Sequence, residues 1–135
     1  MALVLGNSQY ANATKLSNPP ADVRAVASTL QSLGFDRVIS RTELTREQLV
    51  TSLREFARVA AKADWAVVYY SGHGIESGGS NFLIPIDARL ATDRDLQLEA
   101  VDLNAVLASV DSARRLRIVI LDACRDNPFA AQMTR

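Results

Sequence analysis

Hydrophobic and polar positions alternate in two different ways along the chain. Short apolar runs, each bounded by polar residues or glycine, occupy residues 2–6, 37–40, 64–72 and 116–121. Runs of this length predict strands that are buried on both faces of a sheet. Apolar side chains recur at intervals of three and four in residues 21–35, 45–63 and 102–110. This second spacing predicts three helices with one buried face each.

Local signals mark the ends of these elements. Thr45 is followed three residues later by Gln48, which is the pattern of a capping box at a helix N-terminus. Gly34 suits the C-terminal cap of the first helix. Residues 81–87 predict a short hairpin or edge segment, because Pro85 cannot donate a hydrogen bond within a central strand.

The same spacing gives each of the first two helices an apolar stripe, which in the second helix is predicted to be buried. In the first helix the apolar stripe comprises Val23, Val26, Ala27, Leu30 and Leu33. In the second helix it comprises Leu49, Leu53, Phe56 and Val59. In the third strand, Trp65 and Tyr69 are most simply interpreted as core residues.

Strands and helices alternate along the chain, which predicts one α/β domain with a parallel sheet and helices on both faces. In such folds, ligands bind at the carboxyl ends of the strands. His73 follows the third strand and Cys124 follows the fourth. We therefore expect both side chains at the functional edge of one sheet, on strands that can be neighbours.

Composition narrows the possible functions. The chain has 135 residues, of which 48% are hydrophobic, and its 15 basic and 15 acidic side chains cancel. No basic stripe favours nucleic acid or a membrane surface. No apolar stretch is long enough to span a bilayer. The start of the chain has no basic segment typical of a signal peptide, so we expect a cytoplasmic protein.

The single cysteine and the single histidine suggest a specific chemistry. A cysteine peptidase needs a thiolate, a nearby base and donors for the oxyanion, and an imidazole can take the proton of a thiol. Gly72 and Gly74, on either side of His73, would open space for a substrate backbone. The N–H groups of Gly74 and Cys124 would then face the oxyanion. The alternative is a structural histidine and an inert core cysteine.

Two stretches carry a family resemblance. "YYSGHG", which contains His73, and "LDACRDNPF", which contains Cys124 51 residues later, resemble the caspase-like cysteine peptidases, specifically their bacterial metacaspase or orthocaspase branch. The resemblance extends from "ALVLGNSQY" to "DACRDNPF" and corresponds to the large subunit of that family. It implies a caspase-like three-layer α/β sandwich over residues 1–135. It also implies that Cys124 is the nucleophile and that His73 completes a catalytic dyad.

The residue two before the cysteine sets the expected specificity. Caspases have glutamine there, whereas this chain has Asp122, as metacaspases do. The resemblance therefore implies cleavage after arginine or lysine, with Asp22, Ser71 and Asp122 lining the pocket, because carboxylates bind a guanidinium by charge-assisted bonds. As alternatives, Asp122 could cap a turn or pair with Arg125, and Asp22 could serve the first turn of its helix.

The resemblance also raises the question of calcium, which many metacaspases require. Asp87 and Asp102 lie where ligands would be expected, but Ala130 and Ala131 stand where the family often has another acid. Calcium needs six to eight oxygen ligands. We therefore expect no cofactor and treat Asp87 and Asp102 as weak candidates.

Partners and competing functions complete the expectations. We expect a peptide or protein substrate with a basic residue, and a small-subunit segment that completes the sheet. Self-processing after Arg135 would leave the observed end, although an arbitrary boundary would do the same. A non-catalytic caspase-like scaffold or signalling module is the main alternative. An unrelated nucleotide-binding domain is disfavoured, because "GNSQYAN" after the first strand contains only one glycine.

Overall fold

The centre of the molecule is a parallel sheet. The computed structural model describes residues 1–123 and 127–129. Its four strands are β1 (Ala2–Gly6), β2 (Val38–Thr42), β3 (Trp65–Ser71) and β7 (Leu116–Asp122). They lie in the order β2-β1-β3-β7, and every neighbouring pair is parallel. The third and fourth strands, which the sequence allowed to be neighbours, therefore pair directly.

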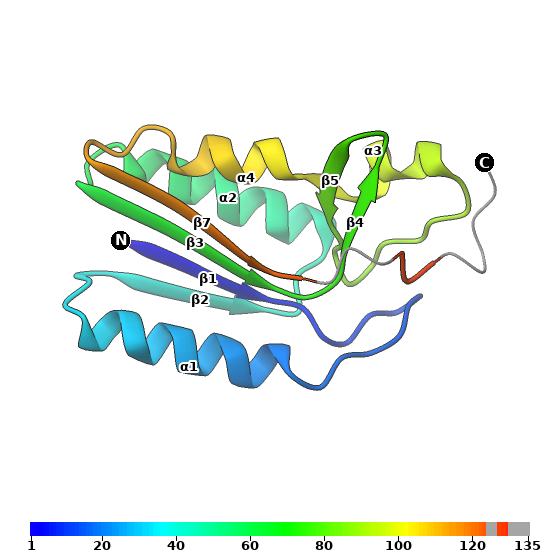
Figure 1. The fold of residues 1–135 in the computed structure, drawn as a ribbon, viewed down its shortest axis with the longest axis horizontal. Helices are drawn as coiled ribbons and strands as arrows, with labels where there is room; N and C mark the ends of the chain where they lie inside the picture. Colours follow the sequence, from blue (N-terminus) through cyan, green and yellow to red (C-terminus); the bar gives the residue numbers. More distant parts are fainter. Residues whose placement is uncertain (124–126, 130–135) are drawn as a thin grey trace.

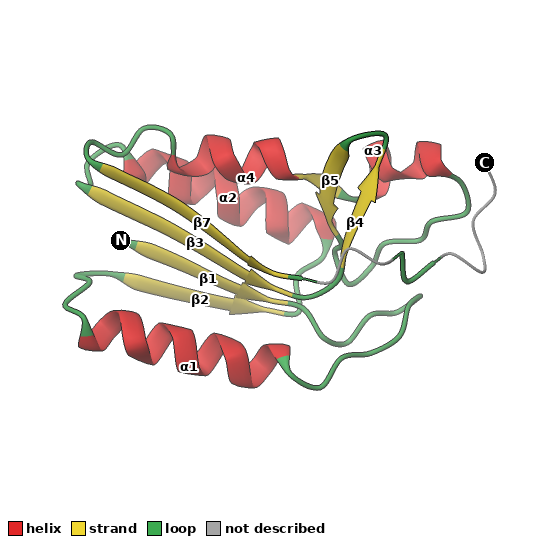
Figure 2. Ribbon diagram, viewed as in Figure 1, coloured by secondary structure: helices red, strands yellow, loops and turns green. Residues whose placement is uncertain are grey.

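Helices cover both faces of this sheet. Helix α1 (Pro19–Ser32) lies on one face, and helices α2 (Arg46–Ala60) and α4 (Leu103–Val110) lie on the other (Figures 1 and 2). This arrangement confirms the expected caspase-like three-layer sandwich. The capping box of Thr45 and Gln48 at the start of α2 is also confirmed.

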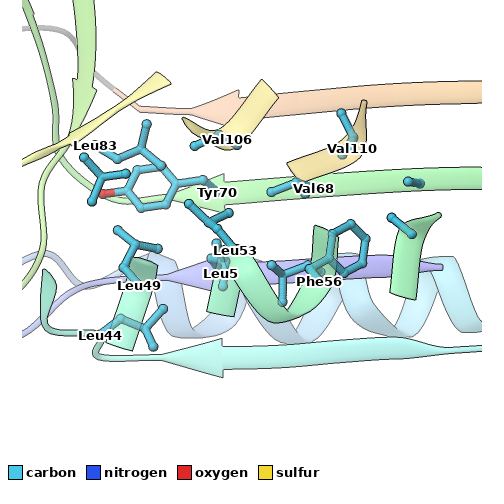
Figure 3. Close-up of a cluster of buried hydrophobic side chains, with 14 of the residues drawn as sticks. Leu5, Leu44, Leu49, Leu53, Phe56, Val68, Tyr70, Leu83, Val106 and Val110 are labelled. Carbon is cyan, nitrogen blue, oxygen red and sulfur yellow. The ribbon is translucent and has the colours of Figure 1, made fainter. Parts of the chain in front are cut away.

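Strand alternation distributes side chains between the two faces. Leu5 of β1 and Tyr70 of β3 join the large apolar cluster under α2 and α4 (Figure 3). Val4 and Tyr69, one position earlier on the same strands, join the cluster under α1. The two adjacent tyrosines of β3 therefore point to opposite sides of the sheet.

A small antiparallel sheet lies beyond the carboxyl ends of the central strands. It consists of β4 (Gly74–Ser77), β5 (Ser80–Leu83) and β6 (Val101–Asp102). Only residues 81–83 of the predicted hairpin or edge segment lie in a strand, and the hairpin that forms pairs β5 with the preceding strand β4. A 3₁₀ turn (Asp93–Asp95) and helix α3 (Leu96–Glu99) precede β6. Strands β4 and β6 and helix α3 are too short to give a recognisable periodicity.

One side chain expected in the core is exposed. Trp65 is 50% exposed, so its interpretation as a core residue was wrong, and Leu33, on the apolar stripe of the first helix, is 71% exposed. Trp65 is the first residue of β3, at the edge of the layered core, where its ring meets Phe35 edge-on. Leu33 is the residue after the last turn of α1. The tail of a helix stripe therefore extends past the surface that it covers.

Strand β7 ends the row of strands in the described part of the sheet. Ile118, Ile120 and Leu121 on it are between 37% and 45% exposed. Among the described residues, β7 pairs with β3 and with no other strand. In the part of the chain that the structure describes, no helix is long and apolar enough to cross a membrane.

Candidate active site

Three strands end side by side at the edge of the sheet where function was predicted. The register places Gly6 of β1 opposite Ser71 of β3, and Ser71 opposite Asp122 of β7. Helix α1 lies close against the end of β1, since a Cβ atom at Gly6 would lie 2.5 Å from a methyl group of Val23. This close approach brings Asp22, in the first turn of α1, to the ends of the strands.

The three predicted pocket residues lie in one group. The Ser71 hydroxyl donates to Asp22 Oδ2 at 3.0 Å, and Ser71 itself is buried. The Tyr69 hydroxyl donates to Asp122 Oδ2 at 3.0 Å. Ser71 and Tyr69 are two positions apart on β3 and therefore face α1 together. The two carboxylates are thus each held by a hydroxyl from the same strand.

Tyr69 was expected only as a core residue, yet its hydroxyl also contacts one of the predicted pocket residues, Asp122. Its side chain is buried under α1, as predicted, while its hydroxyl reaches Asp122. Burial, the hydrogen bond to Asp122 and the negative charges of Asp122 and Asp22 together raise the pKa of Tyr69 to about 12. Tyr69 therefore stays neutral and remains a hydrogen-bond donor to the carboxylate at physiological pH. Its two-residue distance from Ser71 was the signal available in the sequence.

His73 lies in the turn from β3 to β4 and is oriented by a main-chain carbonyl. Its Nε2 atom is 2.7 Å from the carbonyl oxygen of Thr14. A carbonyl oxygen can only accept, so Nε2 carries a proton and Nδ1 is the nitrogen that can receive one. The imidazole also packs against the ring of Tyr10, with centroids 4.5 Å apart. The sequence did not reveal a third group beside Cys124 and His73, because every residue has a main-chain carbonyl and its identity therefore gives no signal.

The loop between β1 and α1, which carries Tyr10 and Thr14, is fastened at its start. The buried side chain of Asn7 accepts from the N–H of Leu44 at 2.8 Å and donates to the carbonyl of Ile84 at 3.3 Å. The Glu43 carboxylate accepts from the N–H groups of Ser8 and Gln9 and from the Ser8 hydroxyl, at 2.6–3.1 Å.

Glu43 holds these bonds from a conformation that side chains rarely adopt. Its φ is 56°, in the left-handed region, and it is the only described residue other than glycine with a positive φ. Such a conformation costs free energy and persists where surrounding contacts enforce it. The loop beside His73 is therefore set by specific polar contacts rather than by apolar packing alone.

The two weak calcium candidates have other contacts. Asp87 Oδ1 accepts from the N–H of Arg46, the first residue of α2, at 2.9 Å. Asp102 is the N-cap of α4 and accepts from the N–H of Asn104 at 2.8 Å. Across residues 1–123 and 127–129, no group of three or more acidic, histidine or cysteine side chains could hold a metal ion. Asp87 and Asp102 thus each accept from a main-chain N–H at the start of a helix.

The remaining predicted site residues are Cys124 and Gly74. Cys124 lies outside the described residues, and so does Arg125; in sequence, Cys124 follows the last residue of β7 by two positions. Gly74 is the first residue of β4 and lines a cavity of about 150 Å³ together with Leu121 and Ala123. This cavity connects the turn after His73 with the segment that leads to Cys124.

The tyrosines allow a simple test of these surroundings. The chain has three tyrosines, and burial raises the pKa of Tyr10 to about 12 and that of Tyr70 well above its usual value. With Tyr69 also raised to about 12, the folded protein should show no tyrosinate absorbance with a midpoint near pH 10. Because the folded pKa values exceed the unfolded ones, the stabilisation is complete below about pH 10 and is lost as the pH rises through about 12.

Spectrophotometric titration would measure this, with the urea-unfolded protein as the control that titrates near pH 10. A third of the tyrosinate signal appearing near pH 10 in the folded protein would show that one tyrosine is not buried as described.

Comparisons with known proteins agree with the geometry. Residues 1–134 match the family defined as the caspase domain of peptidases. The chain is 30% identical over 125 residues to the human mucosa-associated lymphoid tissue lymphoma translocation protein 1 and to its mouse homologue. These matches cover 93% of this chain but 15% of each relative, so the chain spans a small part of their length. Together with the three-layer fold, the match over nearly the whole chain shows that this protein belongs to the caspase domain family of cysteine peptidases.

Proposed function

We propose that this domain is a cysteine endopeptidase of the metacaspase type, which cleaves peptide bonds after arginine or lysine. The observation that carries the specificity is the pair of carboxylates at the ends of the strands. Asp22 and Asp122 are held by the hydroxyls of Ser71 and Tyr69, and Asp122 precedes Cys124 by two residues. A guanidinium from a substrate would bind both carboxylates by charge-assisted hydrogen bonds.

The proposed mechanism uses Cys124 and His73 as a dyad. His73 Nδ1 takes the thiol proton, and the thiolate attacks the carbonyl carbon of the substrate to form a C–S bond. The N–H groups of Gly74 and Cys124 would stabilise the oxyanion of this tetrahedral intermediate. The imidazolium then protonates the leaving amine as the C–N bond breaks. Water, deprotonated by His73, finally hydrolyses the thioester and restores the thiol.

The Thr14 carbonyl supports both roles of His73. It accepts from Nε2 at 2.7 Å, which keeps Nδ1 available for the proton of the thiol. It also stabilises the imidazolium that forms, since an acceptor next to the cation favours the charged state. A main-chain carbonyl thus performs the orienting task that an aspartate performs in a serine protease triad.

We further propose that the exposed edge of β7 is covered in the active protein by a small-subunit segment. Ile118, Ile120 and Leu121 would become buried by such a segment. An apolar edge strand is otherwise a site for unwanted pairing.

The proposed specificity is tested with fluorogenic peptides that differ only in the residue before the scissile bond. We expect the full-length protein to cleave arginine and lysine peptides, with the aspartate peptide at least about 30-fold slower, because an acidic side chain would face two carboxylates. Added calcium or a chelator should not change the rate. Cys124→Ala is the control and should be inactive.

Cleavage after aspartate alone would contradict the pocket assignment. No cleavage of any peptide by the full-length protein would favour the scaffold function instead.

A further inference from the structure

The main chain of His73 is held by two buried tyrosine hydroxyls. The His73 N–H donates to the hydroxyl oxygen of Tyr10 at 2.8 Å. The Tyr70 hydroxyl donates to the His73 carbonyl oxygen at 2.7 Å. The two hydroxyl oxygens are 3.3 Å apart. Three polar contacts therefore connect the N–H of one residue, through two phenols, to the carbonyl of the same residue.

Counting protons gives this connection a direction. A phenol has one proton to donate, whereas a carbonyl oxygen only accepts. The proton of Tyr70 points to two carbonyl oxygens, that of His73 at 2.7 Å and that of Ile84 at 3.3 Å, so the proton between the two phenols must come from Tyr10. The hydrogen bonds then run in one direction, from the His73 N–H to Tyr10, from Tyr10 to Tyr70, and from Tyr70 back to the His73 carbonyl. We call this closed set of three bonds the hydrogen-bond cycle.

The hydrogen-bond cycle lies in the buried interior, where its bonds are strengthened. Tyr10 is 1% exposed and Tyr70 is fully buried; Tyr70 projects from β3 into the cluster under α2 and α4 (Figure 3). Hydrogen bonds that polarise one another are stronger in such a low-dielectric interior. The His73 carbonyl also accepts from the N–H of Ile84 at 3.2 Å. Both polar main-chain groups of His73 are therefore satisfied.

Gly72 provides a second, independent observation. A Cβ atom at this position would lie 2.6 Å from the hydroxyl oxygens of both Tyr10 and Tyr70. Any other residue would displace the two phenols. The sequence predicted that Gly72 opens space for the substrate, but the structure gives a different reason, which is the close approach of the two hydroxyls to the main chain.

The placement of His73 between two glycines makes this support necessary. Glycine has more accessible backbone conformations than any other residue, so Gly72 and Gly74 leave the main chain at His73 weakly determined by its own sequence. A catalytic base must nevertheless lie within hydrogen-bond reach of the proton that it takes. Local flexibility and the required precision are in conflict unless other elements hold the residue.

We propose that Tyr10 and Tyr70 are positioning residues for His73, and that the hydrogen-bond cycle holds the imidazole where the proposed reaction requires it. This inference rests on the proposed function, because it assigns His73 a catalytic task. Tyr10 acts twice, since its hydroxyl holds the main chain and its ring packs against the imidazole. Thr14, on the same loop, holds Nε2. The loop that carries Tyr10 and Thr14 therefore contacts both the main chain and the side chain of the base, while Tyr70 of β3 holds the main chain as well.

The test uses Tyr10→Phe, Tyr70→Phe and the double variant, in the full-length protein. Each single change keeps the aromatic ring and removes one hydroxyl. We expect kcat for an arginine peptide to fall by about 10- to 100-fold, the range produced by small misplacements of catalytic groups, with KM changed by less than about threefold. The double variant should lose no more activity than the worse single variant, because either single substitution already interrupts the hydrogen-bond cycle.

A matched control removes a buried hydroxyl elsewhere. Ser109 on α4 is buried and its hydroxyl donates to the Val106 carbonyl, so Ser109→Ala should lower stability without changing kcat. Unfolding by urea would show that each variant is folded. If Tyr10→Phe does not fold, Tyr70→Phe alone tests the proposal by the same kcat and KM criteria.

A second readout does not depend on activity. His73 is the only histidine, so imidazole nitrogen resonances report on it without assignment. In the unmodified protein the neutral ring should be protonated at Nε2, and Tyr10→Phe should give a mixture of tautomers or broadened signals. If neither kcat nor these signals change, or if the losses in the double variant are additive, the hydrogen-bond cycle does not position His73. If no peptide is cleaved at all, the proposed function fails, and the nitrogen signals still decide the positioning role.

Discussion

His73→Ala is expected to lower kcat for an arginine peptide by about 10²- to 10⁴-fold, the usual contribution of a positioned acid–base group. Its Nδ1 is the nitrogen that can take the proton of the Cys124 thiol, because Nε2 is bonded to the Thr14 carbonyl at 2.7 Å. KM should change little, since the imidazole does not line the pocket for the basic side chain. Steady-state kinetics on the full-length protein would measure both constants.

Alkylation of the single cysteine provides a check on this result that needs no substrate. With His73 present, iodoacetamide should react with Cys124 at a pH below the range of an ordinary thiol, whose pKa is about 8.5. In His73→Ala the reaction should follow an ordinary thiol. Retention of kcat to within about threefold in His73→Ala would show that His73 is not the base.

Asp122→Asn should lower kcat/KM for an arginine peptide by about 30-fold or more. The substitution keeps the shape of the side chain but removes one of the two negative charges that would bind the guanidinium, and removal of one partner from such a pair costs about 2–5 kcal/mol. Asp22→Asn is expected to act in the same direction, because Asp22 is held in the same group through Ser71.

A matched control tests whether the effect depends on position. Asp64 is exposed and precedes the first residue of β3, at the opposite end of the strand from the pocket. Asp64→Asn removes the same charge and should change kcat/KM by less than about twofold. Equal losses in Asp64→Asn and Asp122→Asn would indicate a general effect of net charge rather than a pocket.

The sequence predicted the parts of the fold that depend on local pattern. The capping box of Thr45 and Gln48 formed as expected, because its contacts lie within one helical turn. The parallel sheet followed from the alternation of strands and helices. Trp65 was misplaced, since periodicity predicts a buried position on a strand but does not show where the covering helices stop.

The candidate site also contains some contacts that the sequence could predict and others that it could not. The contact between Ser71 and Asp22 was anticipated only through a family resemblance, because 49 positions separate the two residues. Tyr69 could have been found, since it shares a strand face with Ser71. The contact of the Thr14 carbonyl and the hydrogen-bond cycle could not have been predicted from the sequence, because each depends on how a long loop returns to the end of β3. Polar contacts across such distances leave no periodic signal in the sequence.

The central proposal is that Cys124 is the nucleophile of a peptidase selective for basic residues, and covalent labelling tests it most directly. A peptidyl chloromethyl ketone ending in arginine should react with the thiolate, which displaces chloride and forms a thioether. Mass spectrometry should then show one adduct per chain, on Cys124, formed much more slowly with the aspartate analogue and lost in His73→Ala. Equal rates with the arginine and aspartate reagents, or no adduct with either, would contradict the proposal.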